Sequence, residues 1–372
     1  MKMKNLPFTA ANRAQPLKDL GSADPESFFI TIHHVFDRAK YAVNGTVDRF
    51  YRLGNSVIRL RFAGDVLIPQ ITPALEHLAI EPTSTPSLTI CLWDSISTKT
   101  TMPSPPWSAN DYLPRGEIRG YTNDRIHTAF HPGVWTLSMF DSASNTGLFW
   151  IHDAREIPSY VTGYPLHVIL SWWAHRYGLQ LIHAAAVGAL DGGVLIVGKG
   201  GSGKSTAALS CLLAGFLYAG DDYVLVDDRS VPHVYSLYNS AKLNTDQARS
   251  FPILFSDRPL FQQSDRAKTL TFLYRTHPDQ LAIALPIKAI LLPRITTSPK
   301  SRLERASAGR ILAGLAPSTL FQLPGEDQST LRSLARLVTQ VPNYVLNLGT
   351  DFTTIPDAVH EALARSKTDA AN

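Results

Sequence analysis

The chain has 372 residues, of which 44% are apolar and 18% charged, and its formal net charge is +4. At roughly 100–200 residues per domain this length predicts two domains, and the apolar fraction excludes a wholly disordered or fibrous protein. The mild positive charge is compatible with an anionic ligand, but Lys and Arg are less clustered than in a dedicated nucleic-acid binder.

Cysteine usage and hydropathy bear on the compartment. The two cysteines, Cys91 and Cys211, are too few for a disulfide framework or a zinc site and fit a reducing compartment. The N-terminal segment carries charge but no apolar core of signal-peptide length. The most apolar stretch, 179–197, is interrupted by His183, Asp191 and three glycines, which is typical of buried strands. We therefore expect a cytoplasmic protein with no membrane or nucleic-acid partner.

The N-terminal part of the chain has the pattern of a strand-rich region. Residues 1–25 are polar and contain turn formers, and residues 98–114 are a loop by composition. Between residues 28 and 150, short apolar or alternating runs are separated by clusters of Pro, Gly, Asn, Ser and Thr, which predicts strands. The predicted strands span residues 28–33, 56–62, 87–93, 133–140 and 147–151.

The pattern changes near residues 155–165. Residues 165–177 have helical spacing after Pro165, and strand-like runs then alternate with helical ones. This alternation predicts an α/β layer with a mostly parallel sheet, over residues 161–372. Residues 1–160 are predicted to form an α+β domain for recognition or oligomerisation. The later strands are expected at 181–187, 193–197, 216–220, 223–226 and 287–292, and the later helices at 204–213, 306–313, 329–338 and 355–364.

One motif in the second region has a specific chemical meaning. Residues 198–205 match G-x-x-x-x-G-K-[ST], with a buried-strand run (GVLIV) directly before and a helix-forming run directly after. Glycines let successive N–H groups point at a phosphate, and the helix N-terminus adds partial positive charge. Lys204 can reach the β/γ-phosphates, and Ser205 can ligate Mg²⁺. The expected nucleotide-binding residues are Gly198, Gly200, Gly201, Ser202, Gly203, Lys204, Ser205 and Thr206.

Phosphoryl transfer also requires carboxylates, and two acidic pairs follow the loop. Asp221-Asp222 ends the run 216–220, and Asp227-Asp228 ends the run 223–226. The ends of parallel strands face the ligand crevice, so we favour the first pair, provided that its strand is parallel to the P-loop strand. If the chain reverses there, the second pair falls at the opposite edge as a solvated turn. His183 lies on the strand before the loop, where a lone His is more often a packed core residue.

Residues 183–222 together resemble the catalytic core of HPr serine kinase/phosphorylase. That family carries a His on the strand before the loop, the phosphate-loop motif and an Asp-Asp pair after the next strand; ATP-dependent phosphoenolpyruvate carboxykinase has a similar layout. The strongest likeness is to the shorter HPr-kinase-like proteins beside lasso-peptide clusters, which phosphorylate a Ser of a precursor peptide. The resemblance implies that Asp221 is the general base, that Asp222 helps Ser205 to hold Mg²⁺, and that His183 orients the carboxylates.

Two departures narrow what the resemblance implies. Thr206 stands where HPr kinases have an acidic residue, and no Glu-Ile-Arg-Gly-rich loop follows Asp228. HPr as acceptor and the reverse phosphorylase reaction are therefore not expected. The prediction is an ATP- and Mg²⁺-dependent serine kinase that acts on a peptide or small protein; both a monomer and a homo-oligomer are compatible with the sequence. The alternatives are a nucleotide-binding switch with little turnover and a small-molecule kinase.

Several basic residues follow position 292, and one of them could clamp the transferred phosphoryl group. For any single one of them, a place in a solvated basic loop is the commoner role. The candidates are Arg294, Arg302, Arg305 and Arg310.

Overall fold

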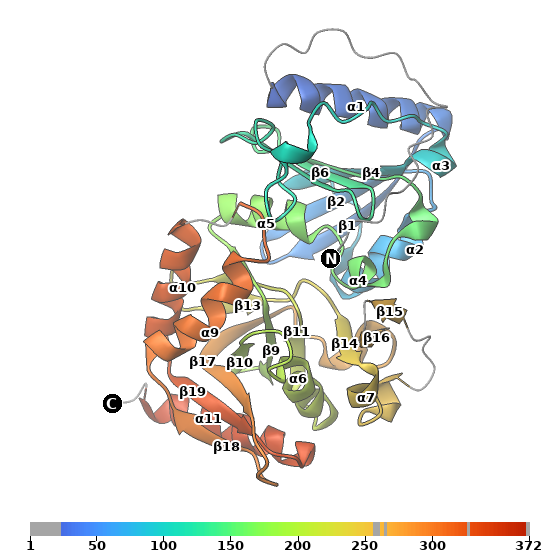
Figure 1. The fold of residues 1–372 in the computed structure, drawn as a ribbon. Coiled ribbons are helices and arrows are strands. Elements are labelled where there is room, and N and C mark those ends of the chain that lie inside the picture. Colours follow the sequence, from blue (N-terminus) through green and yellow to red (C-terminus); the bar gives the residue numbers. More distant parts are fainter. Residues whose placement is uncertain (1–23, 256–260, 264–265, 326–327, 370–372) are drawn as a thin grey trace.

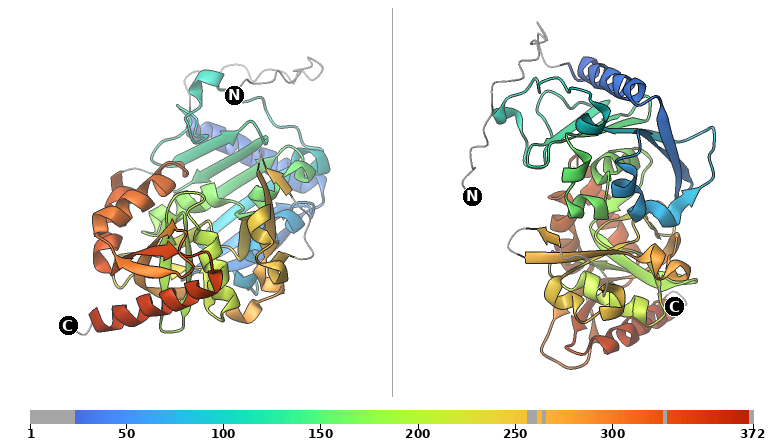
Figure 2. Two further views of the ribbon diagram at one scale, coloured as in Figure 1. Left: turned by 60° about the horizontal axis from the view of Figure 1, so that its bottom comes forward. Right: turned by 90° about the vertical axis from the view of Figure 1, so that its right-hand side faces the viewer.

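The computed structural model describes residues 24–255, 261–263, 266–325 and 328–369. These residues form an N-terminal half and a C-terminal half, each built around its own sheet (Figures 1 and 2). Within the described ranges, no helix has the length and apolarity needed to cross a bilayer. The mixed α/β composition agrees with the predicted fold class.

The N-terminal half is a seven-stranded sheet in the order β3-β1-β2-β4-β7-β6-β5. Helix α1 (Pro25–Ala42) covers one face and α5 (His167–Arg176) the other (Figure 1). Both faces are buried, so successive residues of β4 enter different cores: Ile90 faces α5 and Cys91 faces α1. The strands are β1 (Thr46–Leu53), β2 (Ser56–Ala63), β3 (Ala79–Ile80), β4 (Leu88–Asp94), β5 (Ile126–His131), β6 (Thr136–Asp141) and β7 (Thr146–Ile151).

The prediction of a strand at residues 28–33 is wrong, because these residues belong to α1. Asp24 caps this helix by accepting from the Glu26 N–H, and Pro25 occupies its first turn. Buried Phe28, Phe29, Ile32, Val35, Phe36 and Ala39 recur at helical spacing along one face. The 28–33 window contains too few turns to reveal that period.

Short helices complete this half: α2 (Ile68–Ile71), α3 (Ser95–Thr98), α4 (Ser159–Gly163) and the 3₁₀ segments Thr72–Leu78, Ala109–Asp111 and Ala154–Glu156.

The C-terminal half contains a nine-stranded sheet whose main path is β11-β9-β10-β17-β13-β12-β8, with β19 beside β17 and β18 beside β19. Helices α6 (Lys204–Leu213) and α11 (Ile355–Asp369) pack on one face, and α9 (Ala308–Leu320) and α10 (Gln328–Gln340) on the other. The strands are β8 (Gln180–Ile182), β9 (Ala184–Ala189), β10 (Gly192–Val197), β11 (Leu217–Gly220), β12 (Val224–Asp227), β13 (His233–Tyr235), β17 (Ala284–Ile295), β18 (Arg302–Arg305) and β19 (Asn343–Leu348).

The expectation of a mostly parallel sheet is also wrong. Within this nine-stranded sheet, only the β10–β17 and β17–β19 pairings among its described strands are parallel. Strand β9 is antiparallel to both β10 and β11, and β12 is antiparallel to both β8 and β13. The reason is connection length: β9 and β10 are joined by a tight turn, which cannot hold the crossover that parallel neighbours need.

A small third sheet lies beside α6, with β14 (Ser240–Asn244) paired to β16 (Arg266–Phe272) and β16 to β15 (Phe261–Gln263). Helices α7 (Thr245–Ala248) and α8 (Pro252–Phe255) flank it, and the remaining 3₁₀ segments are Leu273–Arg275, Pro278–Gln280 and Phe352–Thr354. Figure 1 shows this sheet at the right-hand side of the C-terminal half. It was absent from our predictions.

The two halves share an apolar core across the predicted boundary at residue 160. The cluster that contains Ile90 and Leu92 of the N-terminal sheet also contains Trp173 of α5 and Tyr223 and Tyr238 of the C-terminal half. The division into 1–160 and 161–372 remains a prediction.

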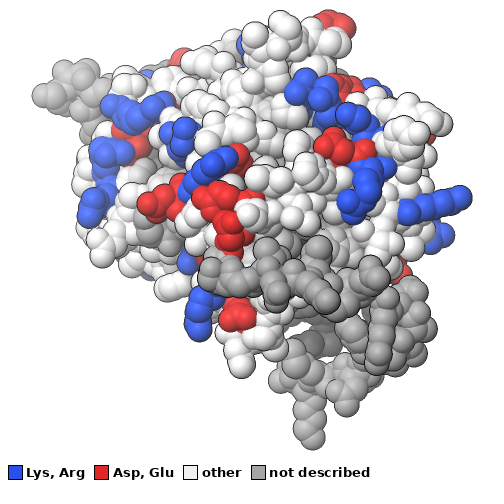
Figure 3. Space-filling view, turned by 90° about the horizontal axis from the view of Figure 1, so that it is seen from above, with Lys and Arg blue, Asp and Glu red and all other residues white. Residues whose placement is uncertain are grey.

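On the outer face above α1, acidic and basic side chains are interspersed (Figure 3).

Candidate active site

The phosphate-loop motif lies between β10 and α6, as its sequence context predicts. Gly198, Gly201 and Gly203 have φ values of 145°, 77° and 102°, a region that glycine enters without steric cost. A side chain at Gly203 would collide with Leu348, whereas a Cβ at Gly200 or Gly201 would meet nothing within 4 Å. The loop is therefore packed at the helix start and open at its tip, as a phosphate cradle requires.

Strand directions bring the first acidic pair to the same edge. Because β9 is antiparallel to both of its neighbours, β10 and β11 run in the same direction. The loop follows β10 and Asp221-Asp222 follows β11, so both lie at one end of the sheet. Asp222 has a φ of 63°, a left-handed conformation that Asp tolerates better than most residues.

A polar cavity of about 270 Å³ is centred on this edge. Its lining comes from the loop and the start of α6, from the end of β11, and from the third sheet with α7. The segments between α4 and α5, between β8 and β9 and after α9 complete it. The lining residues are Tyr164, His183, Gly200, Gly201, Gly203, Lys204, Ser205, Thr206, Asp222, Tyr223, Lys242, Leu243, Asn244, Gln247, Lys268 and Gln322. Most of the predicted site residues are among them.

The two carboxylates of the pair have different environments. Asp221 is buried, and neither carboxylate oxygen has a hydrogen-bond partner of ordinary geometry among the described residues. Burial and the neighbouring Asp222 raise the pKa of Asp221 to about 6, against the opposing influence of Ser205 and Lys204. Asp222 instead lies 2.9 Å from the Lys242 ammonium. Burial alone raises the pKa of Asp222, but Lys242 and His183 outweigh it and hold that pKa well below its usual range.

Two lysines of the third sheet complete the charge distribution. Lys242 on β14 pairs with Asp222 and also lies 4.6 Å from the centre of the Tyr164 ring. In the antiparallel pairing Asn244 of β14 is opposite Lys268 of β16, so Lys242, Asn244 and Lys268 share one face. Burial and the charge of Lys242 lower the pKa of Lys268. The cavity thus contains three ammonium groups, counting Lys204.

Lys204 donates hydrogen bonds to the carbonyls of Gly198 (2.8 Å) and Lys199 (3.4 Å) in its own loop. Its side chain is buried, and burial lowers its pKa. The hydroxyl of Ser202 is buried without a hydrogen-bond partner in the described part of the chain. The loop therefore contains donors that a phosphate can satisfy.

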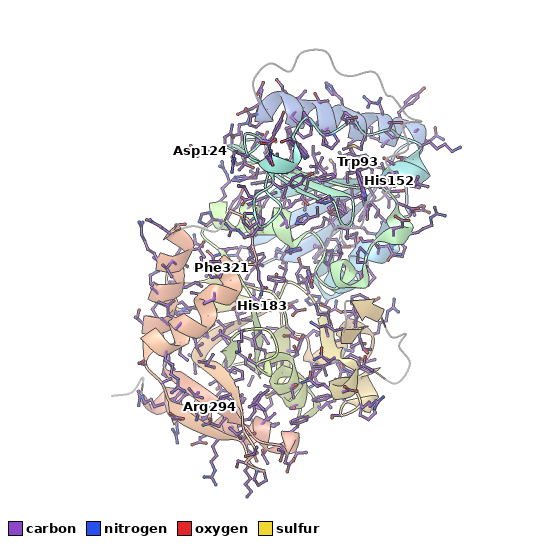
Figure 4. The ribbon with its side chains drawn as sticks, in the orientation of Figure 1. Trp93, Asp124, His152, His183, Arg294 and Phe321 are labelled. Carbon is purple, nitrogen blue, oxygen red and sulfur yellow. The ribbon has the colours of Figure 1, made fainter. Side chains whose placement is uncertain are left out.

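His183 lies between β8 and β9 and interrupts the predicted strand 181–187. Its Nε2 is 3.7 Å from the Asp222 carboxylate, and its ring centre is 5.5 Å from that of Tyr223. Burial lowers the pKa of His183 despite the adjacent carboxylate, so the ring is neutral at pH 7. Figure 4 places His183 on the side of the C-terminal half that faces the N-terminal half. The structure therefore brings His183, Lys204 and the acidic pair together.

The second acidic pair and the arginines are placed elsewhere. Asp227 accepts from Arg229 (2.7 Å) and Asp228 from Arg336 (2.6 Å), and neither lines the cavity. Asp228 is buried, so the pair is a structural ion-pair cluster and not a solvated turn. Arg294 pairs with Glu304 (2.8 Å), and Figure 4 shows it at the opposite end of this half from His183. None of the four candidate clamp arginines lines the cavity.

Sequence reasoning missed Lys242, Lys268, Tyr164 and Tyr223. In KTLTF, Lys268 stands where the alternation would place an apolar residue, and this is a signal that could have indicated it. In SAKLN, Lys242 holds an ordinary polar position of the alternation, so no local signal marks it. Tyr223 directly follows the acidic pair and contacts the rings of His167, Tyr164 and His183. No protein-family model matches the chain, and no curated protein matches it.

The Lys242–Asp222 pair gives a stability prediction. Lys242→Met leaves a largely buried carboxylate uncompensated, so the free energy of unfolding should fall by about 2 kcal/mol at pH 8. Burial raises the pKa of Asp222 once Lys242 no longer opposes it, so protonation of Asp222 should make this loss smaller at pH 5 than at pH 8. Urea unfolding at both pH values measures it, with Lys242→Arg as the charge-preserving control. Equal stability of Lys242→Met and the wild type would contradict the pairing.

Proposed function

We propose that the protein is an ATP- and Mg²⁺-dependent kinase that transfers the γ-phosphate to a Ser hydroxyl of a peptide or small protein. The observation that carries the proposal is the buried Asp221 carboxylate beside Ser205 and Lys204 of the phosphate loop. Neither of its oxygens has a hydrogen-bond partner of ordinary geometry among the described residues. An unpartnered buried carboxylate is costly for folding, and such groups concentrate at functional sites.

The residues present fit a nucleotide polyphosphate and a magnesium ion. The open tip at Gly200 and Gly201, the unsatisfied Ser202 hydroxyl and the three lysines of the cavity suit phosphate oxygens. The unsatisfied Asp221 oxygens next to Ser205 supply the hard oxygen ligands that Mg²⁺ prefers. When bound, the ion would neutralise charge on the phosphate oxygens.

The chain's own groups suggest how the transfer proceeds. The acceptor hydroxyl oxygen forms a bond to the γ-phosphorus, while the bond from that phosphorus to the β,γ-bridging oxygen breaks and ADP leaves. The hydroxyl proton passes to a carboxylate. Lys204 donates to the phosphates, and neutral His183 fixes the position of Asp222.

The contacts favour a division of roles opposite to that implied by the family resemblance. Asp222 lines the cavity, stays ionised and lies next to His183, so we assign it the acceptor's proton. The proton of the attacking hydroxyl becomes strongly acidic as the new P–O bond forms, so a carboxylate of low pKa can take it. Asp221 interacts with Ser205 and is assigned to the metal.

A rate measurement against pH and Mg²⁺ distinguishes the two assignments. Transfer should decline as pH falls through about 6, because Asp221 takes up a proton there. If Asp221 holds the metal, protons and Mg²⁺ compete, and tenfold more free Mg²⁺ should move this limb down by up to about one pH unit. The concentrations are chosen so that all ATP is complexed throughout. A limb that stays fixed would return the base role to Asp221.

The function itself is tested by incubating the full chain with Mg²⁺, ATP and candidate peptides encoded by neighbouring genes. Mass spectrometry should find a peptide carrying one added phosphate on Ser, and none with Lys204→Ala. Phosphate on a metabolite instead of a peptide would identify a small-molecule kinase. ATP binding without any phosphorylated product would identify a nucleotide-dependent switch.

A further inference from the structure

A second and larger cavity lies in the N-terminal half. Its volume is about 530 Å³, within the range of sites for small organic ligands. It lies between the α1–α3 side of the N-terminal half and strands β5, β6 and β7, and it shares no lining residue with the candidate active site. Figure 4 shows His152, at its edge, in the upper half of the molecule and His183 in the lower half.

The walls of this cavity are aromatic and apolar. They are formed by Phe28, Trp107, Phe130, Trp135, Leu137 and Trp150. The indole N–H groups of Trp150 and Trp107 already donate to Ser95 (3.0 Å) and Tyr112 (3.1 Å). These two rings therefore offer apolar surface to a ligand, and their polar requirements are met by the protein itself.

Trp135 is held in a conformation that is costly for its residue type. It lies at the turn between β5 and β6 with a φ of 48°, yet its side chain is 44% exposed. A bulky residue at positive φ costs roughly 1–3 kcal/mol, and such strain persists where it serves a function. Glycine would relieve the backbone strain at this position. The chain has a tryptophan there instead, and its exposed indole lies 6.0 Å from the Phe130 ring, centre to centre, at the cavity wall.

The charge around the cavity favours an anion. Lys99 is exposed at the rim, and none of the lining residues is acidic. The two nearest acids in the sequence are already occupied: Asp94 accepts from the Ser97 N–H at 2.8 Å, and Asp153 pairs with Arg155 at 2.6 Å. Lys99 thus has no carboxylate beside it among the described residues that line the cavity. An ammonium in this setting, next to aromatic walls, suits a ligand with an apolar body and one negative charge.

We propose that this cavity binds a small organic monoanion, an aromatic or branched aliphatic carboxylic acid whose body contacts Trp135 and Phe130 and whose carboxylate pairs with Lys99. This site is separate from the phosphate loop. It makes the N-terminal half a ligand-sensing module and does not depend on the proposed kinase activity.

Calorimetry on the full chain with 2-naphthoate tests the proposal, with 2-naphthylmethylammonium as a probe of similar ring and opposite charge. We expect saturable 1:1 binding of naphthoate and at least tenfold weaker binding of the ammonium compound. Lys99→Gln should weaken naphthoate binding several-fold. No saturable naphthoate binding, or equal affinity for the two probes, would overturn the proposal.

Trp135→Gly separates loss of the site from loss of the fold. It should weaken naphthoate binding at least tenfold while leaving the unfolding temperature equal to or above that of the wild type, because glycine accepts the positive φ. Phe321→Ala, which removes an exposed aromatic ring outside the cavity, should leave binding unchanged. Lys204→Ala should also leave naphthoate binding unchanged. A negative result in this test can therefore be distinguished from a negative result in the test of kinase activity. Unaltered affinity of Trp135→Gly would refute the site.

Discussion

Asp221→Asn should abolish phosphate transfer and at the same time stabilise the unliganded protein. Transfer is expected to fall at least about a thousandfold, because the substitution removes the negative charge opposite the phosphate loop. The carboxylate is buried, has no hydrogen-bond partner of ordinary geometry in the described part of the chain, and has a pKa raised to about 6. Keeping it ionised therefore costs folding free energy, about 3 kcal/mol at pH 8, which the neutral amide does not incur.

The pH dependence of this stabilisation has a defined sign. A carboxyl whose pKa is raised on folding destabilises the native state above that pKa, and protonation removes the cost as pH falls. The advantage of Asp221→Asn should be full above pH 6 and shrink toward pH 4. Urea unfolding of both proteins at pH 8 and pH 4.5 measures it.

Asp227→Asn is the matched control for this substitution. Asp227 belongs to the other acidic pair, carries an Arg229 partner and does not line the site cavity. Its substitution should leave transfer within a few-fold of the wild type and give no gain in stability. An Asp221→Asn protein that retained transfer, or that was less stable than the wild type at pH 8, would contradict the proposed role.

Lys204→Ala should have the second large effect, a fall in transfer of at least about a hundredfold with the fold retained. The ammonium is the loop's own cation and now donates to Gly198 and Lys199, from which it can turn to a phosphate. Lys199→Ala is the control, because that side chain is exposed on the same loop and does not line the cavity. Rates are compared at saturating ATP, with circular dichroism to verify folding. Equal rates for Lys204→Ala and the wild type would exclude the loop from the chemistry.

The sequence was most informative where a local pattern determines the structure. The span of α6 and the strand before the loop followed from motif context, and the favoured acidic pair lies at the loop's edge because β10 and β11 share a direction. Helix α1 was missed because the apolar run 28–33 covers fewer than two helical turns, too few to reveal the amphipathic period. The sheet directions were missed because hydropathy does not distinguish a hairpin from a crossover.

Lys242 and Lys268 could not be assigned to the site from the sequence. They lie on β14 and β16, and only the pairing of these strands and the packing of their sheet against the phosphate-loop half bring both ammonium groups to Asp222. The separation of the two Asp pKa values, one raised and one lowered, follows from this tertiary contact. Residue type and spacing predicted which carboxylates lie at the edge of the phosphate loop, but not how their environments differ.

The most direct test of the central claim is calorimetric titration of the full chain with ATP in excess Mg²⁺. The account predicts saturable binding of one nucleotide per chain, with a dissociation constant between about 1 μM and 1 mM, lost in Lys204→Ala and retained in Lys199→Ala. No saturable binding up to about 1 mM ATP, or undiminished binding in Lys204→Ala, would contradict it.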